Sequence, residues 1–133
     1  MKHGLLGKSL SHSHSPMIHR ALGCADFSLV ETDDPGALFA SKDFESLMVT
    51  IPYKETVLPF LNEWDETARA IGAVNLIVND NGVLKGYNTD VYGLTKMIES
   101  SGIAIQGRQC VVIGHGGAAK CARFVLRSMG AAS

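Results

Sequence analysis

Short apolar segments separated by turn residues recur along the first half of the chain. Three of them have the length and apolar content of buried strands, and they are residues 4–7, 27–30 and 47–50. Between them, Ser15-Pro16 and Asp34-Pro35 are typical helix starts, because Ser and Asp cap helices and Pro is tolerated in the first turn. This alternation of strand and helix favours a parallel sheet covered by helices.

The pattern changes after the third strand. Residues 54–71 have helical character that is interrupted near Pro59 and ends before Gly72. Two apolar runs then follow, residues 74–78 and 83–85, and the turn residues Asn79-Asp80-Asn81-Gly82 join them. Because Asn-Gly favours the tight turns that connect antiparallel strands, these two runs predict a β-hairpin.

The last third of the chain predicts two helices around one strand. A helix capped by Thr89 or Asp90 extends to about Ser100, with Leu94 and Ile98 on one face. After a loop over residues 102–107, the apolar residues 109–113 predict a buried strand. The tight glycine turn at 114–117 and a helix over residues 118–129 complete the chain.

These elements predict an α/β fold in two parts. Residues 1–100 would form one domain, a mainly parallel sheet with flanking helices. Residues 101–133 form the first strand, turn and helix of a Rossmann-like dinucleotide-binding domain, which normally needs several more strands. We therefore expect a truncated second domain.

Composition excludes several classes of protein. Twelve Lys and Arg against thirteen Asp and Glu give a formal charge of −1 without a long basic block, so no nucleic-acid or anionic-membrane surface is expected. No apolar run approaches a membrane span of about 20 residues. The three cysteines are odd in number and form no CxxC pair, which indicates reduced thiols in a cytoplasmic protein.

The glycine turn, residues 114–118, has the sequence Gly-His-Gly-Gly-Ala between a predicted strand and a predicted helix. A phosphate can approach the unpaired backbone N–H groups at such a helix start, where the helix dipole is positive. Dinucleotide binding and a plain tight turn are the two interpretations. His115 either faces the phosphate or is exposed in the loop.

The segment Ser11-His12-Ser13-His14-Ser15 places hydroxyl groups just before a helix start, which suits a small carboxylate. The alternative is a flexible loop with one capping serine. A metal site at His12, His14 and His19 is disfavoured, because no carboxylate or cysteine lies close by in the sequence to complete it. No metal is therefore expected.

Polar residues also follow the predicted strand at 47–50 and the predicted hairpin. Thr50 and Lys54 lie beyond the carboxyl end of their strand, where open α/β sheets bind ligands. Residues 86–90, Gly-Tyr-Asn-Thr-Asp, supply amide, hydroxyl and carboxylate groups in succession. A solvated lysine and a simple helix cap are the alternatives for these two motifs.

Five motifs in one order resemble the shikimate dehydrogenase family, although only the amino-terminal half of its enzymes is covered. They are Ser-His-Ser-Pro-x-x-His (13–19), Val-Thr-Ile-Pro-Tyr-Lys (49–54), Gly-Ala-Val-Asn (72–75), Asn-Thr-Asp (88–90) and Gly-x-Gly-Gly-Ala (114–118). The resemblance implies an oxidoreductase of aromatic amino acid biosynthesis. It would interconvert shikimate and 3-dehydroshikimate with NADP, with NAD not excluded.

The resemblance also implies a role for each matching residue. Ser13 and Ser15 would hold the substrate carboxylate. The ring hydroxyls would be surrounded by Thr50, Lys54, Asn75 and Asp90, of which Lys54 and Asp90 would be the catalytic pair. Lys54 would act as a base or as a charged donor. The cofactor would be held by Gly114, His115, Gly116, Gly117, Ala118 and, by spacing, Glu66.

Three positions depart from the family pattern: Met48, Leu76 and Val91 stand where the family has Asn, Thr and Gly. The expected truncation predicts a weakly active or inactive chain. A non-catalytic module that binds shikimate or a related hydroxy-carboxylate, and a dehydrogenase of quinate or an aminoshikimate, remain alternatives. Apolar residues without their usual neighbours predict self-association through residues 109–130, or poor order there.

Overall fold

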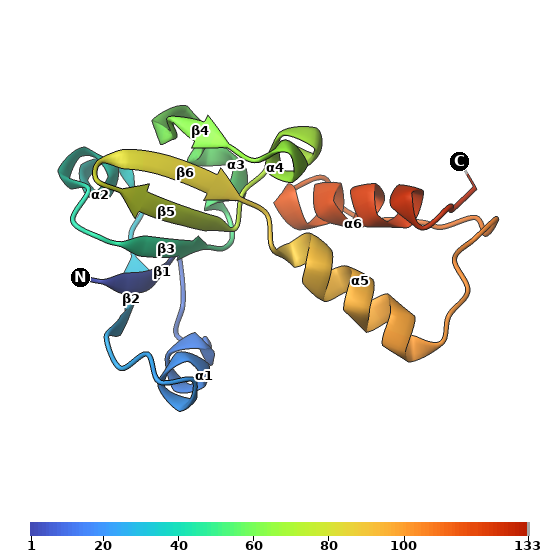
Figure 1. Ribbon diagram of the computed structural model, residues 1–133, viewed down its shortest axis with the longest axis horizontal. Helices are drawn as coiled ribbons and strands as arrows, with labels where there is room; N and C mark the ends of the chain where they lie inside the picture. Colours follow the sequence, from blue (N-terminus) through green and yellow to red (C-terminus); the bar gives the residue numbers. More distant parts are fainter. Residues whose placement is uncertain (133) are drawn as a thin grey trace.

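The computed structural model describes residues 1–132, and within them six strands form one sheet with helices around it (Figure 1). The strands are β1 (His3–Gly7), β2 (Phe27–Glu31), β3 (Ser46–Val49), β4 (Glu63–Trp64), β5 (Leu76–Asp80) and β6 (Val83–Tyr87). The helices are α1 (Ser15–Ala21), α2 (Gly36–Ser41), α3 (Tyr53–Thr56), the 3-10 turn η1 (Leu58–Phe60), α4 (Glu66–Ile71), α5 (Asp90–Ser101) and α6 (Gly117–Ser128).

The sheet has the spatial order β2-β1-β3-β5-β6-β4. The pairs β1–β2, β1–β3 and β4–β6 are parallel, while β3–β5 and β5–β6 are antiparallel, so three of the five pairs are parallel. The mainly parallel α/β sheet predicted from the sequence is therefore confirmed. The predicted hairpin is also present as β5–β6, where Asn81 and Gly82 both have positive φ, as its tight turn requires.

The main apolar core lies against this sheet. Its buried members come from the strands, from the helical segments and from the residues around them: Leu6, Phe39, Phe44, Leu47, Val49, Tyr53, Val57, Ala68, Val74, Ile77 and Leu84. The side chains of Leu6, Leu47, Ile77 and Leu84 are completely buried. Buried residues of β1, β3, β5 and β6 thus anchor the sheet, which fixes the register of the loops at its ends.

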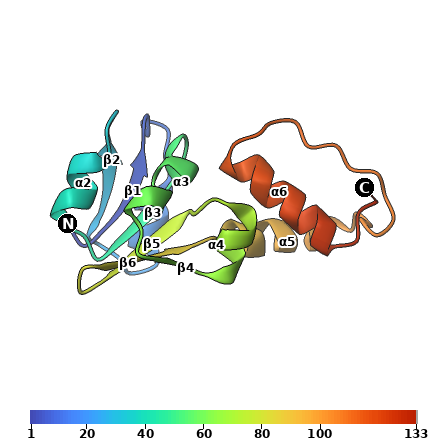
Figure 2. The ribbon, with the colours of Figure 1, turned by 90° about the horizontal axis from the view of Figure 1, so that it is seen from above.

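A second apolar cluster joins α4, α5 and α6 beyond the carboxyl end of β6 (Figure 2). Cys121 and Val125 of α6 are buried against Ile71, and Leu94 and Ile98 of α5 pack on the same cluster. The expectation that the carboxyl-terminal helix lacks apolar neighbours is therefore wrong. One face of α6 is covered by the two helices that precede it.

The predicted strand at residues 109–113 is not formed. Val111 and Ile113 are 87% and 96% exposed, and the segment's one β contact is an isolated bridge between Gln109 and Ala132. A strand is stable only when its backbone pairs with a neighbour. Within residues 1–132 no strand lies beside this segment, so the predicted turn and helix form without the strand.

Two further predictions need correction. The helical stretch at 54–71 is divided into α3, η1 and α4, and the short strand β4 pairs with β6 between them. Ser15 does not cap α1, because the residue at that position is His14; Ser15 instead donates its backbone N–H to Oγ of Ser13. Among residues 1–132, no helix combines the length and the apolar character that crossing a membrane requires.

Candidate functional site

The sheet brings four separate loops to one edge. β1 and β3 are parallel, so the loops that follow them, which contain Ser13 and Thr50, leave at the same edge. β5 runs antiparallel to β3 and begins there, just after Asn75. β6 is antiparallel to β5 and ends there, just before Asn88 and Asp90. Polar residues that are far apart in the sequence therefore meet at one place.

A cavity of about 390 Å³ lies at this edge. It is lined by all six residues that the sequence assigned to substrate binding: Ser13, Ser15, Thr50, Lys54, Asn75 and Asp90. Ser9, Leu10, His12 and Met48 also line it and were not assigned this role. The apolar side chains among them, with Leu5 and Val49, give the polar groups a partly apolar wall, as is common in small-molecule sites.

Lys54 and Asp90 form an ion pair in this cavity. Nζ of Lys54 donates to Oδ2 of Asp90 at 2.5 Å, and the two side chains are 15% and 35% exposed. The other carboxylate oxygen, Oδ1, accepts from Nδ2 of Asn75 at 2.8 Å. Both oxygens of Asp90 are thus bound by donors from different elements, and the lysine is held in one orientation.

Asn75 is buried and organises the start of α5. Its Oδ1 accepts the backbone N–H of Thr89 at 2.7 Å, and its Nδ2 also donates to Oγ1 of Thr89 at 2.9 Å. Thr89, predicted only as a helix cap, makes no capping bond in α5. Its hydroxyl instead supports Asn75. The sequence gives no local signal of this contact, since the two residues are 14 positions apart.

The glycine turn lines a second cavity of about 380 Å³ beside the first. His115, Gly116, Gly117 and Ala118 contribute to it, together with Lys54. Gly114 does not line it; its carbonyl accepts from Nη1 of Arg123 at 3.3 Å. α6 has no acidic residue in its first turn, so its unpaired N–H groups and positive dipole end suit a phosphate.

Gly117 packs directly on the catalytic candidate Lys54. A Cβ at Gly117 would lie 2.9 Å from Cβ of Lys54 and 3.2 Å from Cβ of Ala73, closer than such atoms normally approach. Glycine is therefore needed here for the helix to reach the lysine. Lys54 consequently lines both cavities.

Glu66 stands apart from both cavities. It lies exposed in the first turn of α4, and neither cavity is lined by it. The carboxylate that does line the glycine-turn cavity is Glu55, which pairs with Lys120 of α6. The sequence could not reveal this pair, because its members are 65 residues apart. The cofactor role of Glu66 stays a prediction.

The three positions that depart from the family pattern lie on two sides of the site. Met48 and Leu76 are opposite each other in the β3–β5 ladder, and Sδ of Met48 is 3.2 Å from Nε2 of His19. The ring of His19 stacks on Phe27 at 3.9 Å. Val91 packs on the second apolar cluster. Of these three residues, Met48 places an apolar side chain in the wall of the cavity.

Cys121 lies on the α6 side of the same site. With Lys54, Thr89 and Asp90 it lines a further cavity next to α5. Burial raises the pKa of the Cys121 thiol, and the Asp90 carboxylate raises it further, while Lys54 opposes them. The thiol is therefore neutral near pH 7. All three cysteines are free.

The fold and the site define an α/β domain with a polar ligand cavity at the carboxyl edge of its parallel strands, where a lysine–carboxylate pair adjoins a glycine turn. A protein-family profile described as the shikimate dehydrogenase substrate binding domain matches residues 5–77. The chain belongs to this family.

Relatives and solved structures agree with this assignment. Shikimate dehydrogenase (NADP(+)) of Halothermothrix orenii is 43% identical over 139 residues, which cover 96% of this chain and 48% of the relative. The crystal structure of shikimate dehydrogenase 1 from Peptoclostridium difficile matches with a TM-score of 0.87 and 35% identity, over 98% of this chain and 53% of that one. The shikimate 5-dehydrogenase of Thermus thermophilus, in complex with NADP(H) and shikimate, matches with a TM-score of 0.84 and 32% identity, over 98% and 53%.

The chain thus spans about half the length of these relatives. The match to the Peptoclostridium difficile structure covers 98% of this chain, so it includes the sheet, α5 and α6.

Proposed function

We propose that this chain binds shikimate and takes part in the NADP-linked interconversion of shikimate and 3-dehydroshikimate. The observation that carries the proposal is the single cavity in which the six assigned residues meet around the Lys54–Asp90 pair. The names of the relatives and the NADP(H) and shikimate complex of the Thermus protein support the substrate and the cofactor.

Substrate binding divides between two parts of the cavity. Ser13 and Ser15 stand at the start of α1 and offer hydroxyl donors to the carboxylate of the ligand. Thr50, Asn75 and the Lys54–Asp90 pair offer both donors and acceptors to ring hydroxyls. A hydroxylated ring acid matches this distribution, because a carboxylate needs donors, whereas a hydroxyl group needs both.

The chemistry assigned to Lys54 and Asp90 is proton transfer. When a secondary alcohol is oxidised, its carbon loses a hydride and its oxygen loses a proton. The nicotinamide, when bound, supplies the hydride acceptor. In the direction of reduction, the Lys54 ammonium donates a proton to the carbonyl oxygen and becomes a neutral amine; in the direction of oxidation, that neutral amine takes the hydroxyl proton back. Asp90, fixed by Asn75, orients the lysine. The α6 end that packs on Lys54 through Gly117 brings the two halves of this reaction together.

The residues of the glycine turn fit the pyrophosphate of a dinucleotide. Gly116 has open space where a Cβ would stand, and Gly117 and Ala118, the first residues of α6, line the same cavity. We assign the binding of the pyrophosphate to residues 114–118. The cofactor role of Glu66, which does not line this cavity, stays a separate prediction. Residues 1–100 are the proposed substrate-binding domain and residues 101–133 the start of the dinucleotide-binding domain.

Two further proposals concern the cellular compartment of the chain and its self-association. The three free cysteines support a reducing, cytoplasmic environment. Exposed Val111 and Ile113, with unpaired backbone between them, support self-association through residues 109–130. Light scattering tests the second proposal: a particle larger than one chain is expected, and replacement of both residues by Ser should return it to a monomer.

Calorimetric titration with shikimate tests the proposed function. We expect binding by the 133-residue chain, and a loss of about tenfold or more in affinity when Ser13 and Ser15 are both changed to Ala, because charge-assisted hydrogen bonds to the carboxylate disappear. Ser28→Ala, an exposed serine in β2 outside the cavity, is the matched control. Absence of binding, or equal affinity in the double variant, would contradict the proposal.

Turnover separates the remaining alternatives. We expect negligible NADPH formation from shikimate by the isolated chain, because within residues 1–132 the glycine turn is the one segment proposed to hold the dinucleotide, and hydride transfer needs close positioning. Robust turnover would contradict this expectation. Tighter binding of quinate than of shikimate would instead favour a quinate dehydrogenase.

A further inference from the structure

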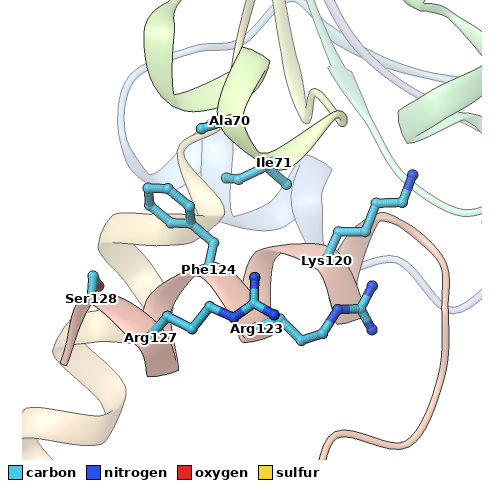
Figure 3. Close-up of a pocket in the computed structure, with 7 residues that line it drawn as sticks. All are labelled: Ala70, Ile71, Lys120, Arg123, Phe124, Arg127 and Ser128. Carbon is cyan, nitrogen blue, oxygen red and sulfur yellow. The ribbon is translucent and has the colours of Figure 1, made fainter. Parts of the chain in front are cut away.

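The largest cavity described in the molecule is separate from the proposed site. It is a groove of about 620 Å³ between α4 and α6 (Figure 3), and it is lined by Ala70, Ile71, Lys120, Arg123, Phe124, Arg127 and Ser128. None of these residues lines the cavity of the Lys54–Asp90 pair or the glycine-turn cavity. Its volume is within the usual range of small-molecule sites, about 300–1,000 Å³.

Positive charge is concentrated on the α6 side of the groove. Lys120, Arg123 and Arg127 follow one another three and four residues apart, and α6 contains no acidic residue. Like charges at this spacing repel each other on a helix. The whole chain has a formal charge of −1, so without these three cations it would carry −4. The positive groove is therefore a local feature of an otherwise acidic chain.

The two arginines are the cations available to a ligand. Lys120 is already neutralised by its ion pair with Glu55. Arg123 donates to the carbonyl of Gly114 at 3.3 Å, and within residues 1–132 no carboxylate lies within 4.0 Å of Arg123 or Arg127. Each guanidinium offers a planar fork of donors that matches phosphate oxygens.

The other side of the groove is apolar. Figure 3 shows Phe124 extending toward Ala70 and Ile71 of α4, while Arg123 and Arg127 extend along the side of α6. Phe124 is only partly buried by the second apolar cluster, which leaves part of its ring to the groove. The groove is therefore lined both by two arginines and by an apolar surface.

We propose that this groove binds a phosphate monoester of an apolar or aromatic group. The dianionic phosphate would match the charge of Arg123 and Arg127 and relieve their repulsion. The apolar part of the ligand would lie on Phe124 and Ile71. This site is distinct from the glycine turn and does not depend on the proposed function.

The test uses 2-naphthyl phosphate, titrated into the ¹⁵N-labelled chain and followed by amide chemical shifts. Shifts are expected at Ile71 and along residues 120–128. The double variant Arg123→Gln/Arg127→Gln should weaken binding by about tenfold or more, and added salt should weaken it further. Arg20→Gln, which removes the same charge in the last turn of α1, is the matched control and should not change the affinity.

Two companion ligands and one further variant separate the parts of the proposal. Inorganic phosphate and 2-naphthol should each bind more weakly than 2-naphthyl phosphate. Inorganic phosphate lacks the aromatic ring that would contact Phe124 and Ile71, and 2-naphthol lacks the phosphate that would bind the arginines. If the double variant does not fold by circular dichroism, the exposed single variant Arg127→Gln takes its place and should still weaken binding. Shifts centred on Gly116 and Gly117, equal affinity in the arginine variants, or no binding at millimolar ligand would overturn the proposal.

Discussion

Residues 74–78 and residues 109–113 are both short runs rich in Val and Ile, yet only the first contributes to a strand. Ile77 in β5 is completely buried and has a paired strand on each side, whereas Ile113 is 96% exposed. The side-chain chemistry is the same. The difference teaches that apolar, β-branched composition indicates what a segment can become, while a neighbouring backbone decides whether it does.

The largest effect expected from this comparison concerns the two isoleucines themselves. Ile77→Ala should lower the free energy of unfolding by about 2–5 kcal/mol, because it leaves a cavity in the sheet core. Ile113→Ala, the same substitution at an exposed site, should change it by less than about 0.5 kcal/mol. Urea denaturation measures both. Similar losses would mean that residues 109–113 are packed in solution.

A smaller effect is expected at Gly117, where the segment that follows residues 109–113 packs on Lys54 and on Ala73, the residue before 74–78. Gly117→Ala places a methyl group against Cβ of Lys54 and Cβ of Ala73, so we expect a net loss of about 1–2 kcal/mol despite the better helix propensity of Ala. Gly116→Ala is the matched control, since no atom lies within 4 Å of its Cβ position; it should cost less than about 1 kcal/mol as a weaker helix cap.

If the Gly117→Ala variant were as stable as the natural chain, α6 would not be seated on Lys54 in solution. The shikimate titration then gives a second measurement. Because the added methyl group displaces Lys54, affinity should fall in Gly117→Ala and stay unchanged in Gly116→Ala.

The smallest effect is a pH dependence from Cys121. The pKa of its thiol is raised in the folded chain above the ordinary value of 9.0, so the neutral thiol stabilises the fold below that value. As the pH rises through 9.0, the unfolded chain releases its proton first and stability falls. Unfolding measured at about pH 8 and about pH 10 should show this loss in the natural chain and less of it in Cys121→Ala. Equal losses would exclude Cys121 as the cause.

Much of the fold could be predicted from the sequence because local patterns specify it. Apart from the division of residues 54–71, the strands and helices up to Ser101 follow from apolar runs and turn residues, and the β5–β6 hairpin follows from Asn81-Gly82. β4 could not be predicted, since two residues carry no periodicity and it exists only through its pairing with β6. The strand expected at 109–113 failed for the opposite reason. Its apolar pattern is strong, but within residues 1–132 no neighbouring strand pairs with its backbone.

The candidate site shows the same division. Its six residues were found through family motifs, and the sheet edge that unites them follows from strand direction. The contacts of Asn75 with Thr89 and of Glu55 with Lys120 depend on the packing of distant elements. The basic groove did carry a signal in the sequence: Lys120, Arg123 and Arg127 share one helix face without an acidic residue between them.

The position of Lys54 at the boundary of two cavities has a thermodynamic consequence. A single ammonium group serves both the cavity of the serines and the cavity of the glycine turn. An anion that draws it toward one side changes the electrostatic free energy on the other, so the two ligands must influence each other's affinity. Linkage requires this influence to be reciprocal, the same factor in both directions. The order in which ligands bind in the two cavities therefore leaves the stability of the complex that holds both of them unchanged.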